Sequence, residues 1–297
     1  GPIITDVSMS TDNAEIYVTF NENVYNTNSG SGDLELSDFT ITRTGGTATL
    51  SSIDSIDTTN NISTIEITLS GTADGSELIT VEPSGSNTIF DSLGNASSTT
   101  QTNNTVYLND KTLPTITAIT LEDDNSAINV TISETVYNTN GGSGSLTVNS
   151  FVLSYSGGTA TVDSVPSSIS ESSNVYTLGL NFNGTVPDGS EEVTVDPSSS
   201  SPIYDEYGNA MAASQSNNTV TLNDEVAPYI TGIQIPYTND SIAVTFNETV
   251  YSTAAQTGSL TVNDLSLNIV GGVATVASTP TSISLSGLTY TLGYTID

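Results

Sequence analysis

Residues 15–25 read EIYVTFNENVY, and the pattern returns twice, as AINVTISETVY at 127–137 and SIAVTFNETVY at 241–251. In the first stretch Ile16, Val18 and Phe20 alternate with Tyr17 and Thr19. Successive side chains of a strand point to opposite faces, so a period of two predicts a β-strand with one face in a core. Each copy therefore contains a strand that ends just before a glutamate.

The recurrence covers most of the chain. Each copy opens on a proline, and the openings lie 112 residues (Pro2 to Pro114) and 114 residues (Pro114 to Pro228) apart. Gly-Gly pairs and Gly-Asn turns recur in the same order, although the third copy is shorter. A fixed period is the signature of tandem modules. The sequence predicts three modules, at residues 1–110, 111–224 and 225–297, the last without the final strands of the others.

Within a module, six to eight short runs rich in β-branched and aromatic residues follow one another. Gly, Asn, Asp and Ser separate them, as expected for turns. The Gly-Gly pairs, such as 45–46, are read as turns of this kind, and no amphipathic helix is evident. The predicted fold is all-β: tandem immunoglobulin-like antiparallel β-sandwiches.

The charge of the chain restricts the classes of partner that it is expected to bind. The chain has 33 Asp+Glu against 2 Lys+Arg, no His and no Cys, for a formal net charge of −31. Such a polyanion repels nucleic acid and anionic membrane surfaces and attracts cations. No run of about 20 apolar residues exists, so no direct membrane insertion is expected. The predicted partners are divalent cations and neighbouring modules or copies of the same protein.

A family resemblance follows from four motifs in order: VTFNENVY (18–25), SDFTITRTGG (37–46), GSELITV (75–81) and FDSLGNA (90–96). This order resembles the immunoglobulin-like repeats of bacterial and archaeal surface proteins, in particular the S-layer module of the SbsA type. The resemblance covers the first two copies and the first part of the third. Copy two departs from it with Ile132-Ser133 in place of Phe-Asn. The resemblance implies an extracellular structural repeat protein of the cell surface, such as an S-layer or an adhesin stalk.

The recurrent glutamates Glu22, Glu134 and Glu248 share strand parity with the core-facing residues before them. Without a bulge they point inward at the end of the sandwich. A buried carboxylate is costly unless it is paired, hydrogen-bonded or protonated. The only basic side chains, Arg43 and Lys111, cannot pair with all three. A metal cation or a group of backbone N–H donors remains, and a bulge that turns the acids to solvent stays an alternative.

Calcium suits this chain because it takes 6–8 oxygen ligands and needs no His or Cys. A calcium ion near each module junction would stiffen the linker. The Asp-x-x-Gly-Asn segments have an alternative reading as ordinary turns, which the sequence favours. Glu77 and Glu191 are further oxygen donors beside the candidates. The candidate metal ligands are Glu22, Asp74, Asp91, Asn95, Asp110, Glu134, Asp188, Asp205, Asn209, Asp224 and Glu248.

The predicted function is a structural tandem-repeat segment of a secreted cell-surface protein, an S-layer or adhesin stalk made rigid by cations. One alternative is a filament subunit whose third module is completed by a neighbour's strand. Another is a carbohydrate-binding module, in which Tyr25, Tyr137 and Tyr251 would stack on sugars, although packing between strands is favoured for them. Catalysis is not expected, because Ser-His-Asp and Cys-His systems are absent and the acids recur in every copy.

Overall fold

The computed structural model describes residues 1–297 and is all-β. Its helical content is two 3-10 turns, Leu36–Asp38 and Val148–Ser150, and no helix is long and apolar enough to cross a membrane. The chain forms two compact units, the first comprising Gly1–Thr185 and Gly189–Asn223, the second Val186–Asp188 and Asp224–Asp297. We call residues 1–110, 111–224 and 225–297 repeats one, two and three. These boundaries stay a prediction from the repeated sequence.

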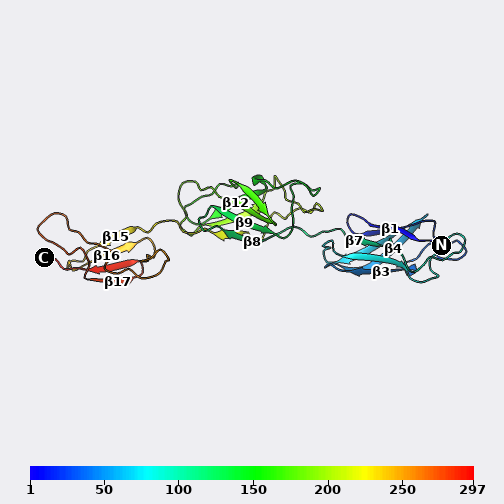
Figure 1. Ribbon diagram of the computed structural model, residues 1–297, viewed down its shortest axis with the longest axis horizontal. Coiled ribbons are helices and arrows are strands. Elements are labelled where there is room, and N and C mark those ends of the chain that lie inside the picture. The colour runs from blue at the N-terminus through cyan, green and yellow to red at the C-terminus, as the bar shows by residue number, and fades with distance from the viewer. The chain divides into compact units, whose positions relative to one another are not determined.

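Repeat one consists of two antiparallel sheets, ordered β1-β2-β5-β4 and β3-β6-β7 (Figure 1). With the strands lettered A to G along the chain, these orders are A-B-E-D and C-F-G, the arrangement of an immunoglobulin constant-type sandwich. The predicted alternation is confirmed in β2, where Ile16, Val18 and Phe20 are all buried. The strands are β1 (Ile4–Met9), β2 (Glu15–Phe20), β3 (Phe39–Thr44), β4 (Thr49–Thr59), β5 (Ile62–Ser70), β6 (Leu78–Pro83) and β7 (Thr105–Tyr107).

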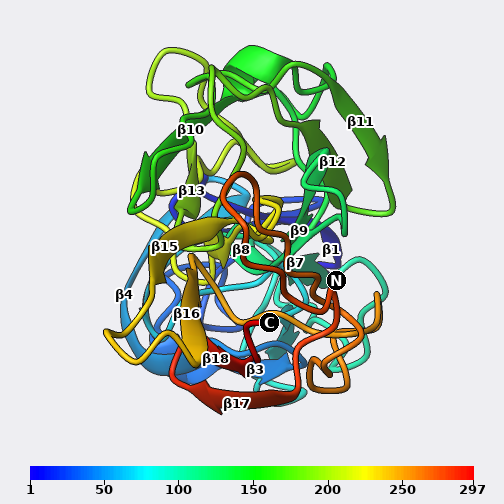
Figure 2. The ribbon, with the colours of Figure 1, turned by 90° about the vertical axis from the view of Figure 1, so that its left-hand side faces the viewer.

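Repeat two has the same topology, with sheets ordered β11-β12-β9-β8 and β10-β13-β14. Figure 2 separates the pair β10 and β13 from the pair β11 and β12, which belong to the two different layers. The strands are β8 (Ile116–Leu121), β9 (Ala127–Ile132), β10 (Phe151–Ser156), β11 (Ile169–Ser172), β12 (Val175–Gly179), β13 (Glu192–Pro197) and β14 (Thr219–Thr221).

Repeat three keeps only the first layer, a sheet ordered β15-β16-β18-β17. Its strands are β15 (Ile230–Gln234), β16 (Ser241–Phe246), β17 (Ser282–Ser286) and β18 (Thr289–Gly293). The segment 265–270, which corresponds to β3 and β10, is not a strand here. It has no neighbour equivalent to β6 or β13 with which to form a ladder.

Each repeat has its own hydrophobic core. In repeat one, Ile16 and Ile65 of the first layer pack with Ile79 and Val81 of the second, and all four are fully buried. Repeat two repeats this arrangement. The core of repeat three has four buried members, Val244, Val250, Tyr290 and Leu292. A single layer leaves one sheet face without a covering layer, which accounts for the smaller core.

Candidate metal centre

Three carboxylates from distant parts of unit one lie together: Asp110, Glu134 and Asp205. Asp110 follows β7, Glu134 follows β9, and Asp205 lies between β13 and β14. One carboxylate oxygen of each lies within 4.8 Å of those of the others. Asp110 and Asp205 are buried and Glu134 is half-buried. We call these three residues the junction cluster, because Asp110 belongs to the linker that leads into repeat two.

Local hydrogen bonds fix the orientation of the two aspartates. Asp205 Oδ1 accepts the N–H groups of Tyr207 (2.8 Å) and Asn209 (2.7 Å), and its Oδ2 accepts the Asn209 amide (2.6 Å). Asp110 Oδ1 accepts both the N–H (2.8 Å) and the hydroxyl (2.7 Å) of Thr112. The Asn209 amide also donates to the backbone carbonyl of Asp110 at 3.1 Å, which ties the linker to the Asp-x-x-Gly-Asn turn.

This arrangement changes the pKa of Glu134. Burial, followed by the negative charges of Asp205 and Asp110, raises the pKa of Glu134 to about 7, against a small opposing effect of a hydrogen bond with Ser133. Like charges at short range disfavour the ionised form, and either a proton or a metal cation relieves the repulsion. The cluster is thus a site of strongly negative potential.

The donor set fits a hard cation. All three ligand groups are carboxylates, and calcium–oxygen distances of about 2.3–2.6 Å place two ligands of one ion at most about 5 Å apart. The observed spread of 4.8 Å falls within that limit. Three carboxylates leave further coordination positions for water, so the residues present are compatible with calcium.

Repeat three contains part of the same arrangement. Asp224 and Glu248 correspond to Asp110 and Glu134, and both line one pocket of about 490 Å³ within unit two. The Asp224 carboxylate accepts the N–H of Val226 at 2.8 Å, as Asp110 does from Thr112. Asp224 and Glu248 do not belong to a group of three acids of the kind that Asp110, Glu134 and Asp205 form.

The remaining predicted ligands belong to no group of three acids like the junction cluster. Asp91 and Asn95 form the same closed turn as Asp205 and Asn209, with bonds of 2.7–2.9 Å, and this hydrogen bonding lowers the pKa of Asp91. Asp74 accepts the N–H of Ser76 at 3.0 Å inside its own turn, and Asp188 is exposed. The interpretation of the Asp-x-x-Gly-Asn segment as an ordinary turn therefore accounts for Asp91 and Asn95, and Asp74 lies in a separate turn.

The recurrent glutamates are not the buried acids that strand parity predicts. Glu22, Glu134 and Glu248 are all only half-buried. Their strands end two residues earlier, for example at Phe20, and a bend follows, so the alternation no longer applies. The predicted burial of these glutamates is therefore wrong, although Glu134 does lie close to two other acids.

The buried glutamates are instead Glu77 and Glu191, both fully buried. Glu77 Oε1 accepts the backbone N–H groups of Thr47 (2.8 Å) and Ala48 (2.7 Å), and Asp74 N–H donates to its other oxygen at 3.1 Å. Glu191 accepts in the same way from Thr159 and Ala160. The sequence predicts both as further oxygen donors for calcium, whereas in the structure they accept hydrogen bonds from the residues that follow the Gly-Gly pairs. A pattern in the sequence could have indicated this contact, because Gly-Gly-Thr-Ala is followed by a later Ser-Glu in both repeat one and repeat two.

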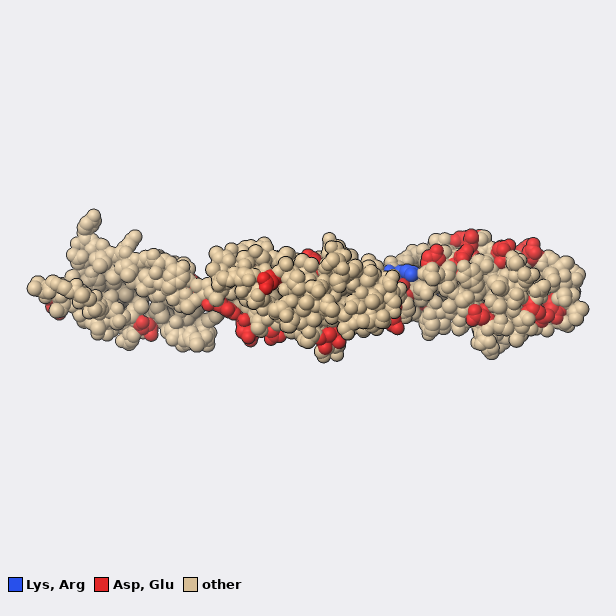
Figure 3. Space-filling view, turned by 90° about the horizontal axis from the view of Figure 1, so that it is seen from above, with Lys and Arg blue, Asp and Glu red and all other residues tan.

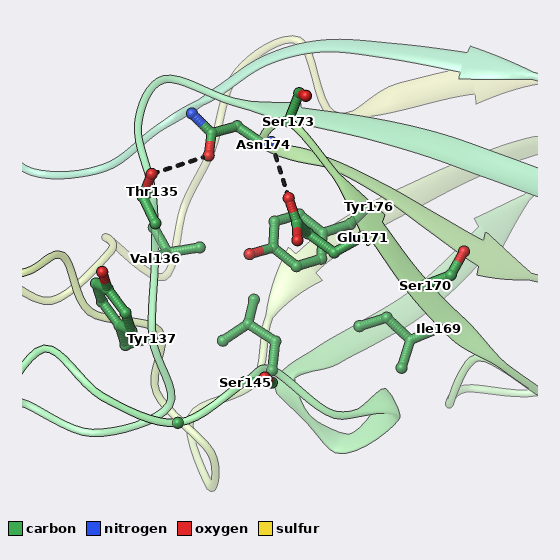
Figure 4. A pocket seen from close by; sticks show the side chains of 12 residues that line it. Thr135, Val136, Tyr137, Ser145, Ile169, Ser170, Glu171, Ser173, Asn174 and Tyr176 are labelled. Carbon is green, nitrogen blue, oxygen red and sulfur yellow. Dashed lines mark hydrogen bonds between the residues drawn. The ribbon is translucent and has the colours of Figure 1, made fainter.

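The recurrent tyrosines line surface pockets. Tyr137 and Tyr176 line a pocket of about 570 Å³ in repeat two, together with Glu171, which lies beside the Tyr176 ring, and Asn174 (Figure 4). The Asn174 N–H donates to Glu171 at 3.1 Å. Burial, then the nearby Glu171, raises the pKa of Tyr176 to about 12, so this phenol is neutral. Tyr25 and Tyr251 line smaller pockets in their own repeats.

Comparison with known proteins gives little information about the function of this chain. No family model matches the chain, and no curated protein matches it. Among solved structures, the chain is similar to FdeC, an Escherichia coli adhesin, at 14% sequence identity over 99% of this chain and 87% of that chain. The TM-score of 0.34 is too low to support any argument from this likeness. The resemblance to S-layer modules stays a prediction.

Proposed function

We propose that this chain is a structural segment of a secreted cell-surface protein, in which tandem immunoglobulin-like sandwiches act as a stalk or lattice element. The observation that carries the proposal is the repetition of one seven-stranded sandwich, in which turn acids and core residues recur together with the fold. Residues selected for a single active site would not need to recur in every copy. We further propose that this segment is not an enzyme. Its proposed partners are neighbouring repeats or other copies of the chain.

Calcium is the proposed stiffening ion, and the junction cluster is its proposed site. Asp110 belongs to the linker, while Glu134 and Asp205 belong to repeat two, so an ion shared by the three would restrain the linker against that repeat. A ligand that binds only the native state stabilises it, by about 2.7 kcal/mol when its free concentration is a hundred times Kd.

The test is thermal unfolding with calcium or with EGTA, both in high NaCl so that general screening of a chain of charge −31 is already complete. We expect calcium to raise the melting temperature of the native chain. Asp205→Asn should abolish most of that rise, whereas Asp91→Asn, which changes the same turn in repeat one away from the junction cluster, should keep it. Identical melting curves with calcium and EGTA would exclude the metal site.

Surface location is tested separately. In cells that produce the protein, we expect an antibody to this chain to label intact cells, and external protease to remove the labelling. Labelling only after cell lysis would refute the proposed location without bearing on calcium.

A second candidate function is carbohydrate binding. The pockets that contain Tyr25, Tyr137 and Tyr251 favour it, since an aromatic ring beside polar groups is suited to a sugar. A glycan array decides the matter: binding that Tyr137→Ala removes would support this function, and an array without any bound glycan would eliminate it.

A further inference from the structure

The pocket of about 570 Å³ in repeat two lies where the repeats differ in sequence. Its lining includes two opposed residues of one hairpin, Glu171 of β11 and Tyr176 of β12. The equivalent pair in repeat one is Thr58 and Ser63, whose hydroxyls hydrogen-bond each other at 2.9 Å. The pocket that Tyr25 and Thr58 line in repeat one has a volume of only about 160 Å³. Repeat one therefore has neither the acid nor the ring, and its pocket is smaller.

Repeat three has a third combination at this position. Tyr290 of β18 corresponds to Tyr176, but the residue opposite it is Leu285. The acid at this position therefore occurs only in repeat two, at Glu171. Residues that the shared fold requires recur in each copy, whereas this pair changes from copy to copy. The sandwich does not require Glu171 at this position, which leaves it available for a ligand.

Tyr176 presents a polar group that the protein does not use. The side chain is 5% exposed, and its hydroxyl makes no hydrogen bond within the protein, whereas the hydroxyl of Tyr290 donates to the Val250 carbonyl at 3.4 Å. In Figure 4 the Tyr176 hydroxyl points from the ring toward the side of the pocket that holds Tyr137. A buried hydroxyl without a partner is costly. A ligand in the pocket could supply the missing hydrogen bond.

The Glu171 carboxylate is held in place but has a free oxygen. Its Oε1 accepts the N–H of Asn174 at 3.1 Å across the hairpin turn, while its Oε2 accepts no hydrogen bond. No ion pair includes this carboxylate, and no basic side chain lines the pocket. Its charge is therefore not compensated within the pocket, which favours a cationic group and repels an anionic one.

We propose that this pocket binds an amino sugar, with the ammonium group on Glu171, the sugar body against the Tyr137 ring and a sugar hydroxyl on the hydroxyl of Tyr176. The inference rests on carbohydrate binding, the second candidate function above, and narrows its ligand class. A carboxylate beside an aromatic ring attracts a cation through its charge and through the quadrupole of the ring. Anionic glycans are excluded by the same carboxylate. Pockets of about 300–1,000 Å³ hold whole small molecules, so the volume favours a sugar over the head group of a lysine side chain.

The test uses the full chain and isothermal titration calorimetry with a trimer of glucosamine, at slightly acidic pH so that its amino groups are protonated. High NaCl screens the general attraction of a chain of charge −31. The matched ligand is the N-acetylated trimer, which has the same rings without the charge. We expect it to bind about tenfold more weakly, because a charge-assisted hydrogen bond is lost.

Protein variants assign this preference to Glu171. Glu171→Gln should weaken binding of the glucosamine trimer by a similar factor and bring the two trimers to similar affinity. Glu192→Gln removes one charge from the other sheet of the same repeat and should have no effect. Tyr176→Phe, which removes the hydroxyl and keeps the ring, should weaken the binding of both trimers.

The outcomes separate this inference from the proposed function. Equal affinity of the native chain for the two trimers would overturn the preference for an amino sugar and leave carbohydrate binding in place. Trilysine that binds as tightly as the glucosamine trimer, and loses affinity in Glu171→Gln, would overturn it too, because the pocket would then recognise a basic peptide. Absence of binding by either trimer would also overturn the inference, and the glycan array would then decide carbohydrate binding by itself.

Discussion

At the scale of single residues, the Gly-Gly pairs are the positions that the fold constrains most clearly. Gly157 and Gly158 have φ values of 77° and 50°, in the left-handed region that residues with a Cβ avoid. Gly158 has a second constraint, since any side chain there would displace the buried carboxylate of Glu191. The sequence reading of these pairs as turns is confirmed, and the carboxylate beside them accounts for why glycine recurs.

Gly158→Ala and Gly272→Ala separate the two constraints. Gly158 has a φ of 50° and Gly272 a φ of 75°, so both substitutions incur the cost of a positive φ, roughly 1–2 kcal/mol. A Cβ at Gly272 would have no atom within 4 Å. Only Gly158→Ala also disturbs Glu191, so we expect it to destabilise its repeat by at least about 1 kcal/mol more. Repeat-resolved hydrogen exchange measures both effects. Equal losses would mean that the buried carboxylate adapts without cost.

Glu134 makes stability depend on pH. Its pKa is about 7 in the folded chain, above the value of 4.5 for a free glutamate, so the folded state binds more protons between these values. Stability contributed by this group is present below about pH 4.5 and is lost as pH rises through 7.

In EGTA we therefore expect the free energy of unfolding to fall across this window, and Glu134→Gln to flatten the fall. Urea unfolding at successive pH values provides the measurement, with Glu22→Gln as the control, because Glu22 belongs to no acidic group of this kind. An unchanged slope in Glu134→Gln would show that the three carboxylates do not interact as described.

At the scale of elements, the C strand shows how far a strand depends on its neighbour. Residues 151–156 and 265–270 have similar alternation, yet only the first is a strand, paired with β13. Leu153 is buried, whereas Leu267 is only half-buried. Pairing and burial, rather than local preference, decide whether this segment forms a strand.

Leu153→Ala and Leu267→Ala form a matched pair. A buried leucine replaced by alanine costs about 2–5 kcal/mol because a cavity remains. We expect a loss in that range at Leu153 and less than half of it at Leu267, where solvent already reaches the side chain. Hydrogen exchange of each repeat gives the two values, and a loss at Leu267 as large as at Leu153 would contradict the difference in burial between the two side chains.

At the scale of the whole molecule, charge governs association. Figure 3 shows acidic side chains spread over the visible face and basic atoms at one place. Sheet edges are often protected by lysine, and this chain has only one, Lys111. We expect repulsion between acids to serve that role while the carboxylates stay ionised.

Light scattering should rise as the pH approaches the sequence pI of about 4.1, where net charge no longer opposes contact between molecules. Unchanged circular dichroism over the same range serves as the control for unfolding. A sample that stays monodisperse through pH 4 would show that something other than net charge keeps the molecules apart.

The sequence by itself determined the all-β class, the repetition and the core-facing residues of strands such as Ile16, Val18 and Phe20. These features depend on the order of neighbouring residues, because burying one face of a strand requires an apolar residue at every second position. Only the tertiary structure decided which acids meet. Asp110, Glu134 and Asp205 are far apart along the chain, and the packing of linker, strand end and turn brings them together. Tertiary structure also buried Glu77 rather than Glu22, because a distant Gly-Gly turn supplies the N–H groups that a buried carboxylate requires, while the strand before Glu22 ends at Phe20.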